Sequence, residues 1–372
     1  MKSRETICIL QVPPFDPINP IGGAEAIAAD LAISLSSIYE VFVLYGHNEI
    51  ISGECHIYKF NDHLFSMKAF TLTDEICYEG EIDPVLSIEA LTLLRKCKAL
   101  LSFERVLKNR LAKLVIANLG GIGYPHCKQV AESKSWDYLV VPSQFVYQWI
   151  TSLNCSKIEQ VRIIRNGINF KKFAHTYPGK QDIALKQLTM LLPCRPDWEK
   201  GFREGINLAK ALKDDGFSVI LKCLKQNYFL DIGSFYEDIE HLASDAGVQL
   251  IINPWVSRDN IRDLYANTDL TLCLGKIPEG FGLTVIESIM SGTPVLARQH
   301  GAVADILPPE HGLIYIEELR LLNVESNKFQ TILEQCRVDC YERGIPYIKN
   351  KYSFQGMLKA YINVINNTSD KQ

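Results

Sequence analysis

Residues 278–294, PEGFGLTVIESIMSGTP, combine a loop with two glycines, Gly280 and Gly282, with two carboxylates and carry the chemistry that the rest of the chain has to support. The apolar run 270–274 before them is typical of a buried strand, and from Leu283 onward apolar residues recur at helical spacing. A strand, a glycine loop and a helix in this order direct backbone N–H groups and a positive dipole end at a phosphate. We therefore expect phosphate to bind at this loop.

The two carboxylates, Glu279 and Glu287, need a different partner, because an acid beside a phosphate repels it. Both are suited to accept hydrogen bonds from hydroxyl groups. A ligand with a diphosphate at its centre and hydroxyls at both ends is a nucleotide-sugar. Glu279 would accept from the sugar hydroxyls, and Glu287 would hold the ribose, as an acid does in dinucleotide-binding folds.

Two cations, Arg195 and Lys200, fall in a loop between a predicted strand (189–193) and a predicted helix (202–212). At this spacing they suit a doubly charged diphosphate and would stabilise the charge that develops as the glycosidic bond lengthens. In isolation they would be better interpreted as solvated loop cations, and it is the glutamate motif downstream that favours a diphosphate site. No pair of acids is spaced for hydrolase chemistry, and no cluster of metal ligands is evident.

The sequence EGFGLTVIESIMSGTPV, with seven residues between Glu279 and Glu287, resembles the donor-site motif of the retaining glycosyltransferases of the glycogen-synthase and sucrose-synthase-like group (glycosyl transferases group 1). Arg195 and Lys200 match that family's Gly-Arg…Lys-Gly pair, with Cys194 in place of the usual glycine. The resemblance implies an α/β fold of two Rossmann-like, doubly wound parallel-sheet domains that face a cleft (GT-B type). It also implies catalysis by Arg195, Lys200 and Glu279, with retention of the anomeric configuration and the leaving phosphate taking the acceptor's proton.

The resemblance further assigns a donor-binding set of glycine turns, helix-start amides and one acid: Gly22, Gly23, Gly280, Phe281, Gly282, Leu283, Thr284 and Glu287. In the family the first glycine turn lies across the cleft from the donor phosphates; a plain tight turn is the alternative. Many members have a histidine at the tip of the strand that we predict at 114–117. Here Asn118 and His126 are the candidates for a contact with the sugar or acceptor, and a surface or helix-start role is the alternative for His126.

A chain of 372 residues suits two domains. We expect an N-terminal Rossmann-like acceptor-binding domain over 1–168, completed by a returning helix at 353–368, and a donor-binding Rossmann-like domain over 169–352. The first should hold an irregular stretch at 46–84, two helices within 85–112 and a helix capped by Ser143. The predicted strands are 7–12, 41–44, 114–117, 138–141 and 161–164, then 189–193, 219–224, 250–253, 270–274 and 295–297.

Composition excludes several other classes of protein. A net charge of −4 with no basic run gives no reason to expect nucleic acid as a partner. The 11 cysteines form no CxxC pair and indicate reduced thiols in a cytoplasmic protein, with a metal site at Cys336 and Cys340 as the minor alternative. No stretch approaches the roughly 20 apolar residues of a membrane span, so membrane contact would be peripheral.

Together these features predict a retaining glycosyltransferase that moves a sugar from a nucleotide-diphosphate sugar, with UDP-sugar expected, to a hydroxyl of a glycan, lipid or small molecule. We expect it to need no metal or other cofactor. One alternative is a nucleotide-sugar epimerase or hydrolase on the same fold, which the four charged donor residues disfavour. The other is a non-catalytic paralogue that binds a partner, consistent with the missing strand-tip histidine and with Cys194.

Overall fold

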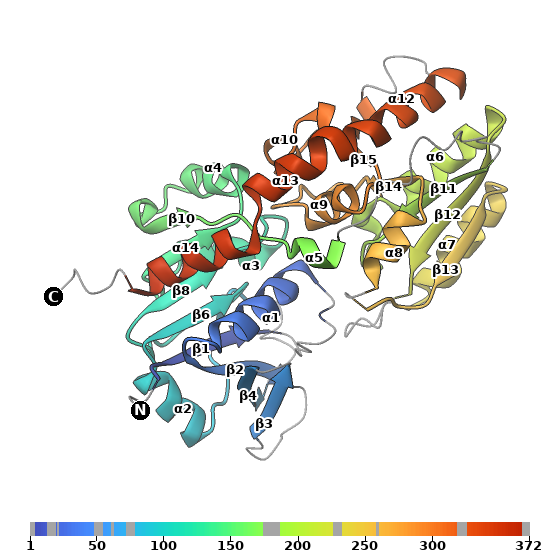
Figure 1. The fold of residues 1–372 in the computed structure, drawn as a ribbon. Coiled ribbons are helices and arrows are strands. Elements are labelled where there is room, and N and C mark those ends of the chain that lie inside the picture. The colour runs from blue at the N-terminus through green and yellow to red at the C-terminus, as the bar shows by residue number, and fades with distance from the viewer. Residues whose placement is uncertain are drawn as a thin grey trace. The chain divides into compact units, whose positions relative to one another are not determined.

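Residues 4–12, 20, 22–47, 55–60, 63–71, 79–173, 187–225, 233–257, 260–317 and 326–366 are described by the structure, a computed structural model (Figure 1). The chain divides into two compact units. Unit 1 is Met1–Gly167 with Phe354–Gln372, and unit 2 is Ile168–Ser353. Each contains a sheet of mainly parallel strands flanked by helices, which confirms the predicted α/β class. The assignment of acceptor and donor to the two units stays a prediction.

The sheet of unit 1 is built around a first strand that is buried from Ile7 to Gln11. Its strands are β1 (Thr6–Gln11), β2 (Glu40–His47), β3 (Cys55–Phe60), β4 (His63–Thr71), β6 (Ala99–Phe103), β8 (Val115–Asn118), β9 (Tyr138–Val141) and β10 (Val161–Ile163). They follow the order β10-β9-β8-β6-β1-β2-β4-β3, and only the β3–β4 pair is antiparallel among these described strands. A central parallel strand is covered on both faces, which is why 7–10 is continuously apolar and fully buried.

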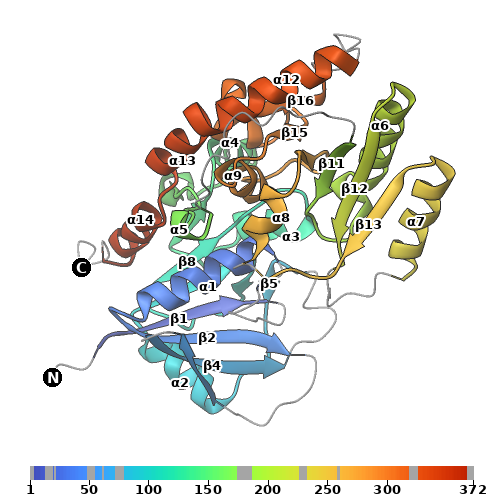
Figure 2. The same cartoon turned by 45° about the vertical axis from the view of Figure 1, so that its right-hand side comes forward.

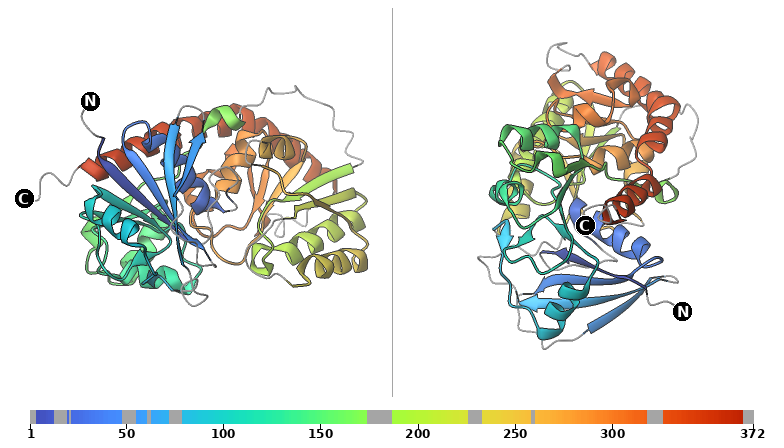
Figure 3. Two further views of the ribbon diagram at one scale, coloured as in Figure 1. Left: turned by 90° about the horizontal axis from the view of Figure 1, so that it is seen from below. Right: turned by 90° about the vertical axis from the view of Figure 1, so that its left-hand side faces the viewer.

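Helices cover this sheet: α1 (Gly23–Leu35), α2 (Ile88–Lys96), α3 (Pro125–Glu132), α4 (Gln144–Ser152) and α14 (Phe354–Asn366). The side chain of Ser143 accepts a hydrogen bond from the N–H of Val146 (3.2 Å), which confirms it as the cap of α4. The last helix returns to the first unit, where α14 packs on α1; the right-hand view of Figure 3 shows the two helices together.

A buried polar contact joins α14 to the centre of the sheet. The hydroxyl of Tyr361 donates to Oδ1 of Asn118 (2.6 Å), and the amide of Asn118 donates to the carbonyls of Ser102 (3.3 Å) and Ile116 (3.2 Å). Burial raises the pKa of Tyr361, so its hydroxyl stays protonated and able to donate. The end of the chain is therefore fixed to strand β8.

Unit 2 has a fully parallel sheet. Its strands are β11 (Gln187–Leu192), β12 (Ser218–Leu224), β13 (Gln249–Asn253), β14 (Leu270–Cys273), β15 (Val295–Ala297) and β16 (Leu313–Tyr315), in the order β13-β12-β11-β14-β15-β16. After β11 the chain adds β12 and β13 on one side of it, and after β14 it adds β15 and β16 on the opposite side. The loops after β11 and β14 therefore leave the sheet side by side at its switch point, where open α/β sheets bind ligands.

Two pairs of helices cover opposite faces of this sheet (Figure 2). One pair is α6 (Phe202–Asp214) with α7 (Phe235–Asp245), and the other is α8 (Ile261–Ala266) with α9 (Leu283–Met290). The hydroxyl of Ser288 on α9 donates to that of Thr271 on β14 (2.8 Å), so the helix after the glycine loop is fixed to the strand before it. Further helices are α5 (Phe170–Phe173), α10 (Val303–Ile306), α12 (Ser326–Asp339) and α13 (Ile345–Lys351).

Two expectations for the first unit are wrong. Within 46–84 the structure has the hairpin β3–β4, where we expected irregular chain, and also the short strand β5 (Glu81–Ile82). Within 85–112 only α2 is helical; residues 99–103 form β6, and β7 (Val106–Leu107) pairs with β5. Residues 99–103 (ALLSF) are buried on both faces of the sheet. Such a short buried run shows neither the alternation of a half-exposed strand nor the spacing of an amphipathic helix, so its sequence does not distinguish the two.

The cysteines that the structure describes carry free thiols, including Cys336 and Cys340, which are buried on α12 and in the π-helical turn that follows. Among the described residues, no helix is long and apolar enough to cross a bilayer.

We predict that Tyr361→Phe lowers the free energy of unfolding by about 1–3 kcal/mol, because Oδ1 of Asn118 is left buried without its donor. Urea unfolding followed by circular dichroism would measure the change. Tyr147→Phe, which alters a partly exposed ring on α4, is the control and should cost less than about 0.5 kcal/mol. Equal losses in the two variants would contradict a structural role for the Tyr361 hydroxyl.

Candidate functional site

The glycine loop of unit 2 lies where the sequence predicts it, between β14 and the first residue of α9, Leu283. Gly282 is the cap residue of α9, and its carbonyl accepts from the N–H of Val285 (3.0 Å). The amides of Leu283 and Thr284 come first in the helix and have no acceptor in a preceding turn. Phe281 is buried and packs edge-on against Tyr352 (5.6 Å between ring centroids), which fixes the loop to unit 2.

The centre of the site is an ion pair between the two switch-point loops. Nζ of Lys200, in the loop after β11, lies 2.7 Å from Oε1 of Glu279, in the loop after β14. Burial lowers the pKa of Lys200, but the charge of Glu279 and the hydrogen bond to it more than offset this, so the pKa lies above its usual value. Lys200 is therefore a fixed positive charge at neutral pH.

Gly201 makes this close approach of the two loops feasible. Its φ is +90°, and a Cβ on it would lie 2.6 Å from the carbonyl carbon of Leu274. Two residues earlier, the carbonyl of Glu199 accepts from the N–H of Lys276 (2.8 Å). The chain around Lys200 is thus held against the end of β14 by its backbone, and this places the ammonium group beside Glu279.

A third loop, after β15, holds the backbone of Glu279. The N–H of Ala302 donates to the carbonyl of Glu279 (2.8 Å), and Gly301 lies so close that a Cβ would be 2.7 Å from that oxygen. Gly301 also has a φ of +69°. In the same loop Arg298 donates to the carbonyl of Leu274 (2.9 Å). Three loops therefore converge on the Lys200–Glu279 pair.

Arg195 lies close enough for its charge to act on Lys200, and its Nη2 atom is 3.7 Å from Oδ2 of Asp197. Asp197 in turn accepts from the N–H of Glu199 (2.9 Å) and caps the short helix Trp198–Lys200. The structure therefore brings together the three residues that we predicted to be catalytic, Arg195, Lys200 and Glu279.

A small pocket beside the Lys200–Glu279 pair contains two thiols. Its lining includes Cys194, Cys273, Thr284 and His300. Cys194 stands at the position where we noted a departure from the family pattern, and its thiol lies 3.8 Å from the carbonyl of Lys200. Burial raises the pKa of Cys194 to about 12 and also raises that of Cys273. Both thiols are neutral at physiological pH and are not nucleophiles.

Glu287 faces a buried tyrosine. The hydroxyl of Tyr265, whose ring is almost completely buried, lies 3.3 Å from Oε2 of Glu287. Burial, and next the charge of Glu287, raise the pKa of Tyr265, so the phenol remains a hydrogen-bond donor. Tyr265 orients the carboxylate that we predicted to hold ribose. Sequence reasoning missed it, because the contact joins α8 to α9 and leaves no local pattern.

The predicted site residues of unit 1 have local roles that the structure defines. Gly22 and Gly23 are exposed at the start of α1, where the N–H of Gly22 donates to the side chain of Glu25 (3.4 Å). Asn118 is committed to the contacts with Tyr361, Ser102 and Ile116 described above. Their contacts with donor or acceptor stay predictions.

His126 is placed beside an acid that sequence reasoning missed. It lies in the first turn of α3, with Nε2 3.4 Å from Oε2 of Glu104 and its ring stacked on Tyr124. Glu104 follows β6 directly, within the stretch that we expected to be helical. The pair is thus formed at the carboxyl edge of the sheet of unit 1.

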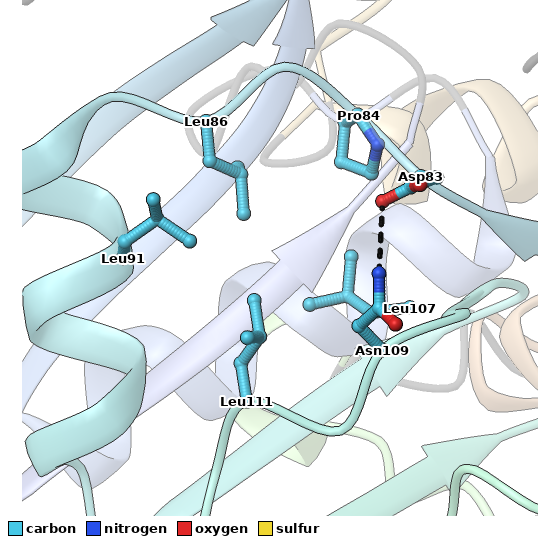
Figure 4. Close-up of a pocket in the computed structure, with 7 residues that line it drawn as sticks. All are labelled: Asp83, Pro84, Leu86, Leu91, Leu107, Asn109 and Leu111. Carbon is cyan, nitrogen blue, oxygen red and sulfur yellow. Dashed lines mark hydrogen bonds between the residues drawn. The ribbon is translucent and has the colours of Figure 1, made fainter.

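A separate hollow of about 170 Å³ lies in unit 1 and has mostly apolar walls (Figure 4). Its rim carries one polar contact, in which the amide of Asn109 donates to Asp83 (3.4 Å). Two exposed apolar side chains, Val85 and Ile88, are close to it in the sequence. Its lining offers no cation for a phosphate, unlike the pocket of unit 2.

The sequence resembles known proteins over part of its length. Residues 175–318 match the model of the family "Glycosyl transferases group 1". Over 178 residues, 47% of the chain, it is 23% identical to the sulfoquinovosyl transferase SQD2 of Arabidopsis thaliana. That match spans only about a third (33%) of the curated relative's length.

Two solved structures of similar fold cover almost the whole chain. A sucrose-phosphate synthase from Thermosynechococcus elongatus superposes with a TM-score of 0.73 at 15% identity, over 98% of this chain and 99% of the other. The Anabaena protein HepE, solved in complex with UDP-glucose, gives 0.73 at 14% identity, over 97% and 99%. These similarities establish a common GT-B fold.

We predict that Gly301→Ala destabilises unit 2 by about 1–3 kcal/mol more than Gly216→Ala. Both glycines have positive φ, so both variants share the cost of a left-handed backbone. Only at position 301 does the added methyl meet the backbone of Glu279, whereas at 216 it meets nothing within 4 Å. Urea unfolding compares them, and equal midpoints would contradict the close packing of the two loops.

Proposed function

We propose, from the match of residues 175–318 to the group 1 glycosyltransferases, that this protein transfers a sugar from a nucleotide-diphosphate sugar to an acceptor hydroxyl with retention of configuration. The observation that carries the proposal is the Lys200–Glu279 contact of 2.7 Å at the switch point. It places a cation suited to a diphosphate and an acid suited to sugar hydroxyls at a single point. A nucleotide-sugar needs both at the bond that breaks.

Lys200 can serve the acid and the phosphate together, because an ammonium group has three donors. One N–H holds Glu279, and the others are available to oxygens of the diphosphate. Arg195 supplies a second charge to the same group. As the glycosidic bond lengthens, negative charge grows on the leaving phosphate, so these cations stabilise the transition state more than the bound donor.

Glu279 would receive hydrogen bonds from hydroxyls of the transferred sugar, and its fixed backbone would keep the anomeric carbon in register with the diphosphate. The amides of Leu283 and Thr284 would add the dipole of α9. Glu287, oriented by Tyr265, would accept from the two ribose hydroxyls of the nucleotide. In this arrangement Gly280, Phe281 and Gly282 shape the loop and make no chemical contribution of their own.

The finer assignments are parts of the same proposal. We infer a UDP-sugar, since HepE was solved with UDP-glucose. Retention follows from the family resemblance, with the leaving phosphate accepting the proton of the acceptor. The reaction would need no metal, since Arg195 and Lys200 supply the positive charge. We assign the acceptor, a glycan, lipid or small molecule, to unit 1.

A second candidate is a non-catalytic paralogue that binds a partner protein. Asn118 favours it, because this residue stands at the tip of β8 where many family members have a histidine, and its side chain is used in structural hydrogen bonds. Turnover separates the two functions, since a paralogue would bind nucleotide without releasing it from a nucleotide-sugar. Release of nucleotide from a nucleotide-sugar without any acceptor would instead indicate a hydrolase.

We predict that Lys200→Ala and Glu279→Ala each reduce nucleotide release from a UDP-sugar by about 100-fold or more, since each removes a group that acts on the transition state. A coupled assay for UDP would measure the rate. Lys210→Ala is the matched control, because it removes a lysine from an exposed ion pair with Asp214 in the same unit. Wild-type rates in Lys200→Ala would contradict the proposal, provided that the wild-type protein turns over.

We further predict that UDP raises the melting temperature more than GDP or ADP does, and that Glu287→Ala reduces this shift. A ligand that binds only the native state stabilises it by mass action, so the shift reports binding independently of turnover. Differential scanning fluorimetry gives the comparison. Identical shifts for the three nucleotides, or none, would contradict recognition of a uridine donor.

A further inference from the structure

Unit 1 contains a compact group of three metal-binding side chains that the proposed reaction does not use. Glu104 follows β6, and His126 and Cys127 lie in the first turn of α3. One ligand atom from each, a carboxylate oxygen, an imidazole nitrogen and a thiol sulfur, lie within 4.8 Å of one another. These are the three kinds of donor that zinc takes in proteins.

The separation of the acid and the imidazole is long for a hydrogen bond and also fits a shared ion. Nε2 of His126 is 3.4 Å from Oε2 of Glu104, beyond the usual N–H···O distance of about 2.9 Å. In tetrahedral zinc with bonds of about 2.0–2.2 Å, two such ligand atoms lie about 3.4 Å apart. A sulfur ligand with a bond of about 2.3 Å lies about 3.6 Å from them, and the thiol of Cys127 is already within 4.8 Å of both.

The carboxylate of Glu104 is held in position by groups that are not ligands. Its other oxygen, Oε1, accepts from the N–H of Gly120 (2.6 Å). The backbone of Glu104 has a φ of +60°, an unfavourable conformation for a residue with a side chain, and such strain clusters at binding sites. Metal-binding carboxylates are typically fixed by an outer hydrogen bond of this kind.

The partial exposure of two ligands leaves room for an ion to enter. The side chains of His126 and Glu104 are 13% and 18% exposed, whereas Cys127 is fully buried beneath them. The ring of Tyr124 stacks on His126 (5.6 Å between ring centroids) and limits its rotation. Three protein ligands with solvent on one side correspond to a zinc site with one open coordination position.

We propose that Glu104, His126 and Cys127 bind a divalent zinc-type cation at the carboxyl edge of the sheet of unit 1. On binding, the thiol of Cys127 loses its proton to solvent, so one proton is released per ion and no electron is transferred. The ion would fix the start of α3 to the end of β6. All three side chains belong to unit 1, and the proposed site goes beyond the proposed glycosyl transfer.

The test uses the full-length protein after dialysis against a chelator, with Co²⁺ as a spectroscopic probe. We expect one Co²⁺ per chain and the near-ultraviolet absorption band of a cobalt–thiolate bond, which Zn²⁺ then displaces. His126→Gln and Cys127→Ser should each weaken binding by more than about tenfold, since loss of an outer-shell group alone costs that much. Cys127→Ser should also abolish the thiolate band.

Matched controls separate this site from the other thiols and imidazoles of the chain. Cys336→Ser, at another buried cysteine, and His241→Gln, at an exposed histidine on α7, should leave stoichiometry and absorption unchanged. His126→Gln alters a partly exposed residue, so it keeps the test valid if Cys127→Ser fails to fold. No stoichiometric binding, or binding that survives both ligand variants, would overturn the proposal. The melting-temperature shift with UDP should be the same in all four variants, so a failure here does not bear on glycosyl transfer.

Discussion

The candidate site of unit 2 depends on bringing one positive and one negative side chain to the same point. Lys200 and Glu279 come from loops that are 79 residues apart in the sequence, and the switch in strand order between β11 and β14 makes them neighbours. The pairing lowers the cost of partly burying each charge. Because the partners remain partly exposed, a ligand that brings its own phosphate and hydroxyls can share both of them.

Backbone packing, more than the attraction between the charges, sets this geometry. Gly201 lies against the end of β14, and Gly301 lies against Glu279, with distances that admit no side chain. A partly exposed ion pair contributes little free energy by itself, so it could not hold three loops in place. The sheet and the glycines position the charges, and the charges are then available for chemistry.

The loop before α9 could be predicted because its signal is local: a two-glycine turn, two acids and a helical period lie within 17 residues. The strand runs were identified for the same reason. Glu104 could not be found, because the run before it, 99–103, has the composition of either a strand or a helix. Glu104 comes close to His126 only when β6 and β8 pair. In the same way, Tyr265 reaches Glu287 only when α8 packs against α9. Contacts between distant segments leave no pattern in either segment.

The hydrogen bond between Tyr361 and Asn118 joins residues 243 positions apart, across the entire sequence of unit 2. During synthesis on a ribosome, the first unit therefore waits for its last helix until the second has emerged in full. Domains generally fold as they leave the ribosome, so the unit that begins the chain would be completed last. A chain that stops before α14 would thus leave unit 1 incomplete.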